Sequence, residues 1–101
     1  MRTIHLARLD KVRPALVLTR DVIRPHLNQV TVAPISSTVR GLATELLLGR
    51  KNGLDHDSVA NLDNVTTIPT ALLGEQIGFL LESQELELTE AIAAAYDLDL
   101  P

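Results

Sequence analysis

The 101 residues suit one domain, residues 1–101, and their apolar and charged fractions, 46% and 22%, are those of a soluble globular protein. No apolar run approaches the roughly 20 residues that a membrane helix needs, and the N-terminus lacks the layout of a signal peptide. We therefore expect a cytoplasmic protein with no membrane partner. The absence of cysteine excludes disulfides, zinc-thiolate sites and thiol nucleophiles.

Charge is divided unevenly along the chain. Residues 1–51 hold all nine Lys and Arg against three acids, a net charge of +6, whereas residues 52–101 hold ten acids and no Lys or Arg, a net charge of -10. This split suggests one face for a polyanion and another that is solvated or paired with a basic partner. The alternative is that the two halves attract each other across the fold.

The first two predicted strands form a tight hairpin. Residues 3–9 alternate imperfectly between apolar and polar, and the apolar run over 15–19 predicts a buried strand. Pro14 has no N-H for a strand ladder and fits the beginning of a strand, which places Arg13 at the lip of the core. There Arg13 can present its planar fork of donors to a phosphate or a carboxylate. Alternatively, it is an ordinary charge on the rim.

The remaining elements predict a mainly β domain of the α+β class, a small, strongly curved sheet or barrel with a terminal helix. Pro34, in the strand over 30–35, needs an edge or a bulge, and Asn52-Gly53 marks a turn. Ser83 is the expected N-cap of the last helix. The predicted elements after the hairpin are a loop over 21–29, strands over 30–35, 43–48, 57–61, 65–68 and 76–81, a short helix over 69–73 and a helix over 84–96.

One arginine and a cluster of hydroxyl groups form the strongest candidate site. Arg13 begins one strand, and a polar cluster follows another, so the two can converge on one anion if the strands share a sheet. The cluster consists of Ser36, Ser37, Thr38 and Arg40.

Other chemistries find less support in the residues. A nucleophilic serine lacks a Gly-x-Ser-x-Gly elbow and a base placed by sequence, and the acids cluster on the terminal helix and nearby loops as a solvated face. His5, His26 and His56 are far apart in sequence, so we predict no metal site and no cofactor. Arginine with a hydroxyl can bind a phosphodiester and stabilise charge that develops on it. RNA suits this set better than DNA, because RNA supplies its own nucleophile, the 2'-hydroxyl.

The order of three segments resembles the MazF/PemK/Kid toxins of bacterial toxin-antitoxin pairs, which are sequence-specific mRNA endonucleases. The segments are Val12 to Leu18, Val32 to Ser37, and Asp57 to Ile68, with an acidic helix at the end. The similarity runs from about residue 11 to residue 98.

The resemblance implies an SH3-like β-barrel with short helices, a homodimer that binds single-stranded RNA at its interface, and a cognate antitoxin. It implies metal-independent cleavage by 2'-hydroxyl attack to give a 2',3'-cyclic phosphate and a 5'-hydroxyl. By this likeness Arg13 transfers a proton and binds the phosphate, and Ser36, where many relatives have threonine, stabilises the transition state. Further RNA contacts are expected from Lys11, Arg20, Ser37, Thr38 and Arg40.

The chain departs from the family pattern near its N-terminus. Relatives often have a longer, glycine-containing loop before Arg-Pro, whereas here only a few residues separate the first strand from Arg13. That loop commonly helps to cover the RNA groove. Two other functions remain open, a gyrase-binding toxin of the CcdB type, which shares the barrel, and a non-catalytic small barrel that serves as an interaction module.

Overall fold

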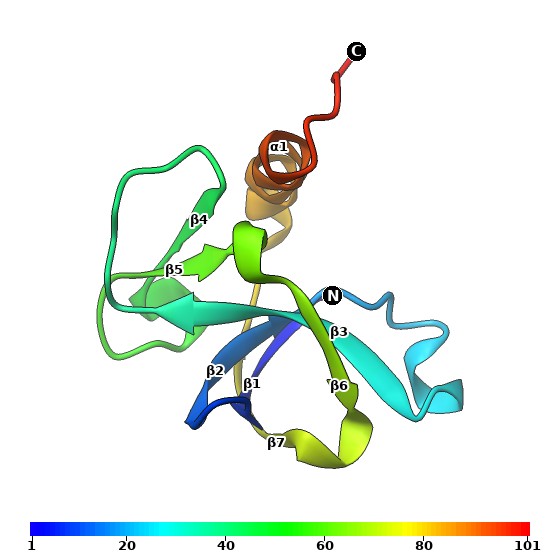
Figure 1. Ribbon diagram of the computed structural model, residues 1–101. Coiled ribbons are helices and arrows are strands. Elements are labelled where there is room, and N and C mark those ends of the chain that lie inside the picture. Colours follow the sequence, from blue (N-terminus) through cyan, green and yellow to red (C-terminus); the bar gives the residue numbers. More distant parts are fainter.

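The computed structural model describes residues 1–101 and has seven strands, five short 3-10 helices and one α-helix (Figure 1). The mainly β fold with a C-terminal helix is as predicted. The elements are β1 Thr3–Arg8, β2 Val12–Val17, η1 Arg24–His26, β3 Gln29–Ser36, β4 Glu45–Leu48, η2 Arg50–Asn52, β5 Ser58–Asn61, η3 Leu62–Asn64, β6 Thr66–Pro69, η4 Thr70–Leu72, β7 Leu73–Phe79, η5 Glu82–Gln84 and α1 Glu85–Ala95.

All seven strands belong to one antiparallel sheet. Its order is β4-β5-β3-β2-β1-β7, and β6 pairs with the first half of β3. The second half of β3 pairs with β5 instead, so the sheet bends where β3 changes partner. The end strands β4 and β7 do not pair with each other, and the predicted barrel is therefore an open, curved sheet.

The central strands β2 and β3 are buried on both faces of the sheet. Leu16 of β2 packs into a core with Ile35 and with Leu88 of α1, whereas Val17 packs into a second core with Val32. Successive side chains of a strand point to opposite faces, so a strand covered on both sides reads as an unbroken apolar run. This explains the aliphatic stretch after Pro14. Helix α1 covers the first core with the apolar face expected from its spacing.

Pro14 and Pro34 occupy strand positions where one side of the strand is unpaired. Pro14 pairs with Leu6 of β1, and the ladder between β2 and β3 begins only at the next residue. Pro34 pairs with Ala15 of β2, and it lies between the segment of β3 that pairs with β6 and the segment that pairs with β5. A residue without an N-H therefore costs the sheet no ladder bond at these two points.

Several predicted boundaries need correction. Strand β2 begins before Pro14 and β7 begins at Leu73, because pairing with β1 extends the start of each strand. Strand β2 also ends earlier than predicted, at Val17. The predicted helix over 69–73 is a single 3-10 turn. Ser83 does not cap α1, because it lies inside η5; the N-cap position of α1 is held by Gln84, which makes no side-chain bond to that helix. No helix has the length and apolar character needed to cross a membrane.

The ion pairs explain little of the uneven charge. Three of the four join groups within residues 1–51, and only the pair between Arg2 and Glu85 joins the basic half to the acidic half. Six of the nine Lys and Arg side chains make no ion pair. Attraction between the halves is thus a minor feature of the fold, and cations remain available to a partner.

Candidate active site

The hairpin of β1 and β2 positions Arg13. Its turn is closed by the N-H of Leu9, which donates to the carbonyl of Lys11 at 3.0 Å, and Arg13 pairs with Ala7 across the ladder. Nη2 of Arg13 donates to Oδ2 of Asp10 at 2.9 Å. The Arg13 side chain is only 25% exposed, whereas that of Asp10 is 71% exposed. A largely exposed carboxylate thus holds a mostly buried guanidinium in place.

One donor of Arg13 is unsatisfied. Its Nε is buried and has no hydrogen-bond partner. A buried donor without a partner costs about 1–3 kcal/mol, and an anion would supply the missing acceptor. Because Nε and a terminal nitrogen form one edge of the guanidinium fork, this edge suits the two oxygens of a phosphate.

Ser36 lies close to Arg13, because the two residues line the same two pockets. The ladder between β2 and β3 ends at the pair Ala15 and Pro34, two residues from each of them. The Oγ of Ser36 accepts the N-H of Thr38 at 3.0 Å. A hydroxyl that accepts in this way still has its own proton to donate. An anion held by Arg13 can therefore receive a second hydrogen bond from Ser36.

Arg13 and Ser36 line two adjoining pockets of about 460 and 190 Å³, which we call the Arg13–Ser36 groove. All strands except β6, the connections on either side of β4, and η3 supply its walls. The larger pocket is lined by Leu6, Lys11, Arg13, Pro14, Ile35, Ser36, Ser37, Gly53, Leu54, Asp55, His56, Ser58 and Ile77. The smaller one is lined by Arg13, Pro34, Ser36, Thr38, Arg40, Glu45, Val59, Asn61 and Asn64.

Most of the predicted site residues come together in this groove. Lys11 and Ser37 line the larger pocket, and Thr38 and Arg40 line the smaller one. Arg20 lines neither. Only its charge grouped Arg20 with the other predicted site residues, and the chain turns away from the groove at the end of β2.

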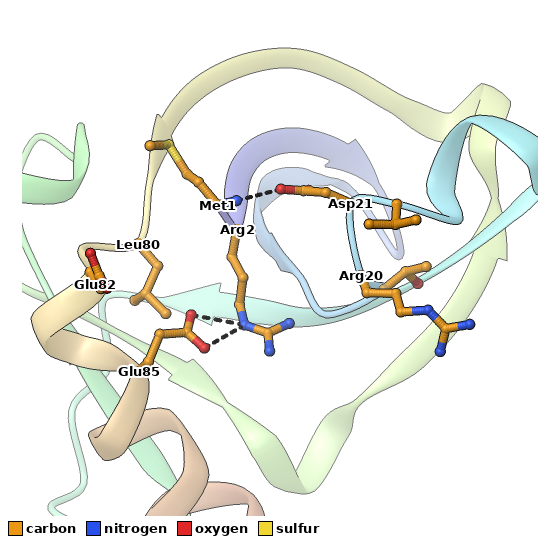
Figure 2. A pocket seen from close by; sticks show the side chains of 9 residues that line it. Met1, Arg2, Arg20, Asp21, Leu80, Glu82 and Glu85 are labelled. Carbon is orange, nitrogen blue, oxygen red and sulfur yellow. Dashed lines mark hydrogen bonds and ion pairs between the residues drawn. The ribbon is translucent and has the colours of Figure 1, made fainter.

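Arg20 instead lies in a separate pocket of about 550 Å³ (Figure 2). The N-terminal ammonium of Met1 pairs there with Asp21, and Nε of Arg2 donates to the Glu85 carboxylate at 3.0 Å. Figure 2 shows the Arg20 side chain extending away from that ion pair. These contacts tie the first residues to the loop after β2 and to the start of α1, which is a structural role.

The carboxyl of Asp21 has a pKa below its ordinary value of 3.8. The largest cause is the hydrogen bond from the N-terminal ammonium; desolvation acts in the opposite direction, and the charges of the ammonium, Arg24 and Arg2 lower the pKa further. Hydrogen bonds and positive charges both favour the ionised form of a carboxyl group.

Several groove residues were missed from the sequence. Asp55 and His56 follow the turn at Asn52-Gly53, and the polar residues Glu45, Ser58, Asn61 and Asn64 also line the pockets. The only signal was the polar loop after a turn, which by itself does not say what the loop faces. No group of three or more His, Asp or Glu side chains is arranged to hold a metal ion.

Comparison with known proteins identifies the family. Residues 4–96 match the family of the PemK-like, MazF-like toxin of type II toxin-antitoxin systems. Because the match spans nearly the whole chain, this protein is a member of that toxin family.

Individual relatives agree with this assignment. The chain is 62% identical over 99 residues to endoribonuclease MazF3 of Mycobacterium tuberculosis, covering 98% of this chain and 96% of the relative. A solved structure of the M. tuberculosis toxin MazF-mt6 superposes with a TM-score of 0.96 at 61% identity, covering 98% and 100% of the two chains. An endoribonuclease from a mycobacterial species, solved in complex with its cognate antitoxin, shares the fold at 23% identity and a TM-score of 0.86, with coverages of 98% and 95%.

Proposed function

We propose that this protein cleaves single-stranded mRNA at short recognition sites in the Arg13–Ser36 groove, without a metal ion. Membership of its family makes it an endoribonuclease toxin. The observation that carries the proposal is the buried, unpartnered Nε of Arg13 in a pocket that also holds the Ser36 hydroxyl. An arginine donor and a hydroxyl that face one space are the groups that a phosphodiester needs in order to be bound and polarised.

The reaction that fits these groups is internal transfer within RNA. The ribose 2'-oxygen forms a bond to the neighbouring phosphorus, and the bond from phosphorus to the 5'-oxygen of the next nucleotide breaks. The 2'-hydroxyl loses its proton and the leaving 5'-oxygen gains one, so the products are a 2',3'-cyclic phosphate and a 5'-hydroxyl. In this proposal Arg13 and Ser36 donate hydrogen bonds to the phosphate oxygens as negative charge accumulates on them.

Proton transfer needs an acceptor as well as a donor. Arginine keeps its charge in proteins, so in this proposal Arg13 donates hydrogen bonds to the phosphate and the leaving oxygen without giving up a proton, and the group that takes the proton of the 2'-hydroxyl passes it on to the leaving 5'-oxygen. The titratable side chains that line the groove beside it are Glu45, Asp55 and His56, and each can accept a proton from the 2'-hydroxyl.

The rim of the groove suits the rest of the RNA strand. Lys11 and Ser37 line the larger pocket, and Thr38 and Arg40 line the smaller one. Neither Lys11 nor Arg40 makes an ion pair. Phosphate contacts by such residues give affinity that falls as salt concentration rises. The single Phe and single Tyr offer little for base stacking, so polar contacts carry recognition in this proposal.

We also infer a cytoplasmic homodimer that is neutralised by a cognate antitoxin. Leu47 of the edge strand β4 is 63% exposed, and Leu86 and Tyr96 at the two ends of α1 are also exposed. Exposed apolar side chains on an edge strand and a helix are typical of an interface. A monomer by light scattering at micromolar concentration contradicts the dimer. An antitoxin segment with acidic or apolar residues fits the basic groove.

The deciding experiment is incubation of a long single-stranded RNA with purified protein in excess EDTA, followed by mapping of the ends. We expect cleavage at a few sites, with 5'-hydroxyl and 2',3'-cyclic phosphate ends, and none with the Arg13→Ala variant. Ends that carry a 5'-phosphate, or cleavage that EDTA abolishes, contradict the mechanism. A gyrase-binding toxin or a non-catalytic module leaves the RNA intact.

A further inference from the structure

One wall of the Arg13–Ser36 groove is a loop rather than a strand. Residues 53–56, which we call the groove loop, follow η2 and lead toward β5, and all four line the larger pocket. Leu54 is buried in the main core, whereas Asp55 and His56 are exposed. The shape of the groove therefore depends on how firmly this loop is held.

The buried side-chain amides of Asn52 and Gln84 fix the residue that precedes the groove loop. Nδ2 of Asn52 donates to Oε1 of Gln84 at 2.6 Å and to the carbonyl of Phe79 at 3.1 Å, and its Oδ1 accepts the N-H of Gly49 at 3.1 Å. Oε1 of Gln84 also accepts the N-H of Leu81 at 3.0 Å. The two residues are 1% and 2% exposed. This set of bonds joins η2 to the end of β7 and to the residue before α1.

The backbone at the same point is pressed against β7. Gly53 has φ of +89°, and a Cβ on it would lie 2.2 Å from the carbonyl oxygen of Ile77, which itself lines the groove. A Cβ on Gly78 would lie 1.7 Å from the carbonyl oxygen of Asn52. Both glycines are thus required for the close approach of the two backbones. The hydrogen bonds of Asn52 and Gln84 therefore act where the backbone at the start of the groove loop is already in close contact with β7.

We infer that Asn52 and Gln84 are positioning residues for RNA cleavage, which set the groove loop against Arg13 and Ser36 although neither lines the groove. The inference rests on the proposed function. Buried polar groups that are fully hydrogen-bonded specify one arrangement, because any shift leaves a donor or an acceptor unpaired. Loss of such support behind a site typically lowers activity about 10- to 100-fold, since misplacement by about 1 Å suffices.

The first test is Gln84→Met, which keeps the size of the side chain and removes its hydrogen bonds. Compared at a temperature where both proteins are folded, we expect kcat to fall about 10- to 100-fold and the set of cleaved RNA sites to change. The matched control is Ile68→Val, a change in the second core, none of whose residues lines the groove, which should lower the melting temperature but leave the cleaved sites unchanged. Equal kcat and identical sites for Gln84→Met and the wild type overturn the inference.

A second variant covers the case in which Gln84→Met does not fold. Gln84→Glu keeps an oxygen for the N-H of Leu81 and for Asn52, but the ionised carboxyl has no proton to donate to Oδ1 of Asn52. Once protonated, it can also donate to Oδ1 of Asn52, as the Gln84 amide does at 3.4 Å. We expect its rate relative to the wild type to rise as the pH is lowered from about 8 to about 5. A ratio that is constant with pH contradicts the inference.

If the proposed function is wrong, the wild type itself does not cleave RNA in this assay, which differs from a defect confined to the variants. Amide hydrogen exchange then judges the positioning role alone. We expect Gln84→Met or Gln84→Glu to speed exchange in residues 53–56 while exchange in β2 stays unchanged. Unaltered exchange in the groove loop overturns the positioning role whatever the activity.

Discussion

Nη2 of Arg13 donates to Oδ2 of Asp10 at 2.9 Å across the turn of the β1–β2 hairpin, while Nε of the same guanidinium is buried without a partner. The carboxylate thus engages Nη2 and leaves Nε without an acceptor. Because Asp10 is largely exposed, water and salt weaken its attraction to the arginine. A phosphate in the groove meets a guanidinium that is already oriented.

Asp10→Ala should therefore change kcat/KM by no more than about fivefold, since an exposed ion pair is worth about 0–1 kcal/mol. RNA binding at low salt should strengthen slightly, because a negative charge beside the groove is removed. Steady-state cleavage of a short RNA and fluorescence anisotropy measure the two effects. A loss as large as that of Arg13→Ala would mean that Asp10 takes part in the chemistry itself.

Arg13→Lys separates a catalytic arginine from a charge on the rim. Lysine keeps the charge but not the planar fork, and loss of one preorganised contact to the transition state costs about 100-fold or more in rate. We expect such a loss of kcat for Arg13→Lys and a larger one for Arg13→Ala, with a smaller effect on RNA affinity because Lys11 and Arg40 remain. Circular dichroism serves as the control for folding. Near-normal cleavage by folded Arg13→Ala returns this residue to a structural role.

Ser36→Ala and Ser36→Thr form a matched pair. The first removes the hydroxyl close to Arg13, and the second keeps it and adds a methyl group at a half-buried position. We expect kcat to fall about 100-fold or more for alanine and to stay near the wild-type value for threonine. Single-turnover cleavage with excess protein gives both rates. Similar rates for the two variants would remove the hydroxyl from the mechanism.

Much of the fold could be predicted from local patterns. The spacing of Leu88, Ala91 and Ile92 identified α1, and the short link between two apolar runs identified the first hairpin. The start of β7 was missed, because Leu73 ended the predicted short helix, the three residues after it are exposed, and only pairing with β1, as of Leu73 with Ala7, extends the strand. Pairing of this kind depends on residues far away in sequence, which a local pattern does not contain.

The site was predictable only in part, for a related reason. Arg13 and Ser36 were recognisable as residue types at the ends of strands, and the register of β2 with β3 brings them together. Arg20 could not be separated from them by charge, although the loop after β2 carries it elsewhere. The groove loop could not be foreseen either, because Asn52 and Gln84, which hold it, are 32 residues apart and meet only in the folded chain.

Ionisation of Asp21 should make the free energy of unfolding depend on pH under acidic conditions. Its pKa is lowered in the folded state, chiefly by the hydrogen bond from the N-terminal ammonium, so the unfolded chain binds a proton more readily. The resulting stabilisation is present above the unfolded pKa of about 3.8 and is lost as pH falls through the lower folded value. We expect a small difference in unfolding free energy between wild type and Asp21→Asn, shrinking below about pH 4. Urea unfolding at several pH values measures it. A difference that is constant down to about pH 2 contradicts the assignment.

Glu45 should govern the basic loop at the mouth of the smaller pocket. Its Oε1 accepts the N-H groups of Arg40 and Leu42, each at 3.1 Å, which fixes the loop that presents Arg40 to the groove. Glu45→Gln keeps this acceptor and removes a negative charge, so it should bind RNA more tightly than the wild type at low salt. Glu45→Ala removes the acceptor as well.

We expect Glu45→Ala to bind about fivefold more weakly than Glu45→Gln, because two backbone donors lose their partner and the loop no longer holds Arg40 in place. Fluorescence anisotropy with an RNA that carries 2'-deoxyribose at the cleavage site measures binding without turnover. The comparison at low and high salt separates charge from geometry, since the effect of charge fades with salt and the effect of loop order does not. Equal affinities for the two variants would show that Glu45 acts only through its charge.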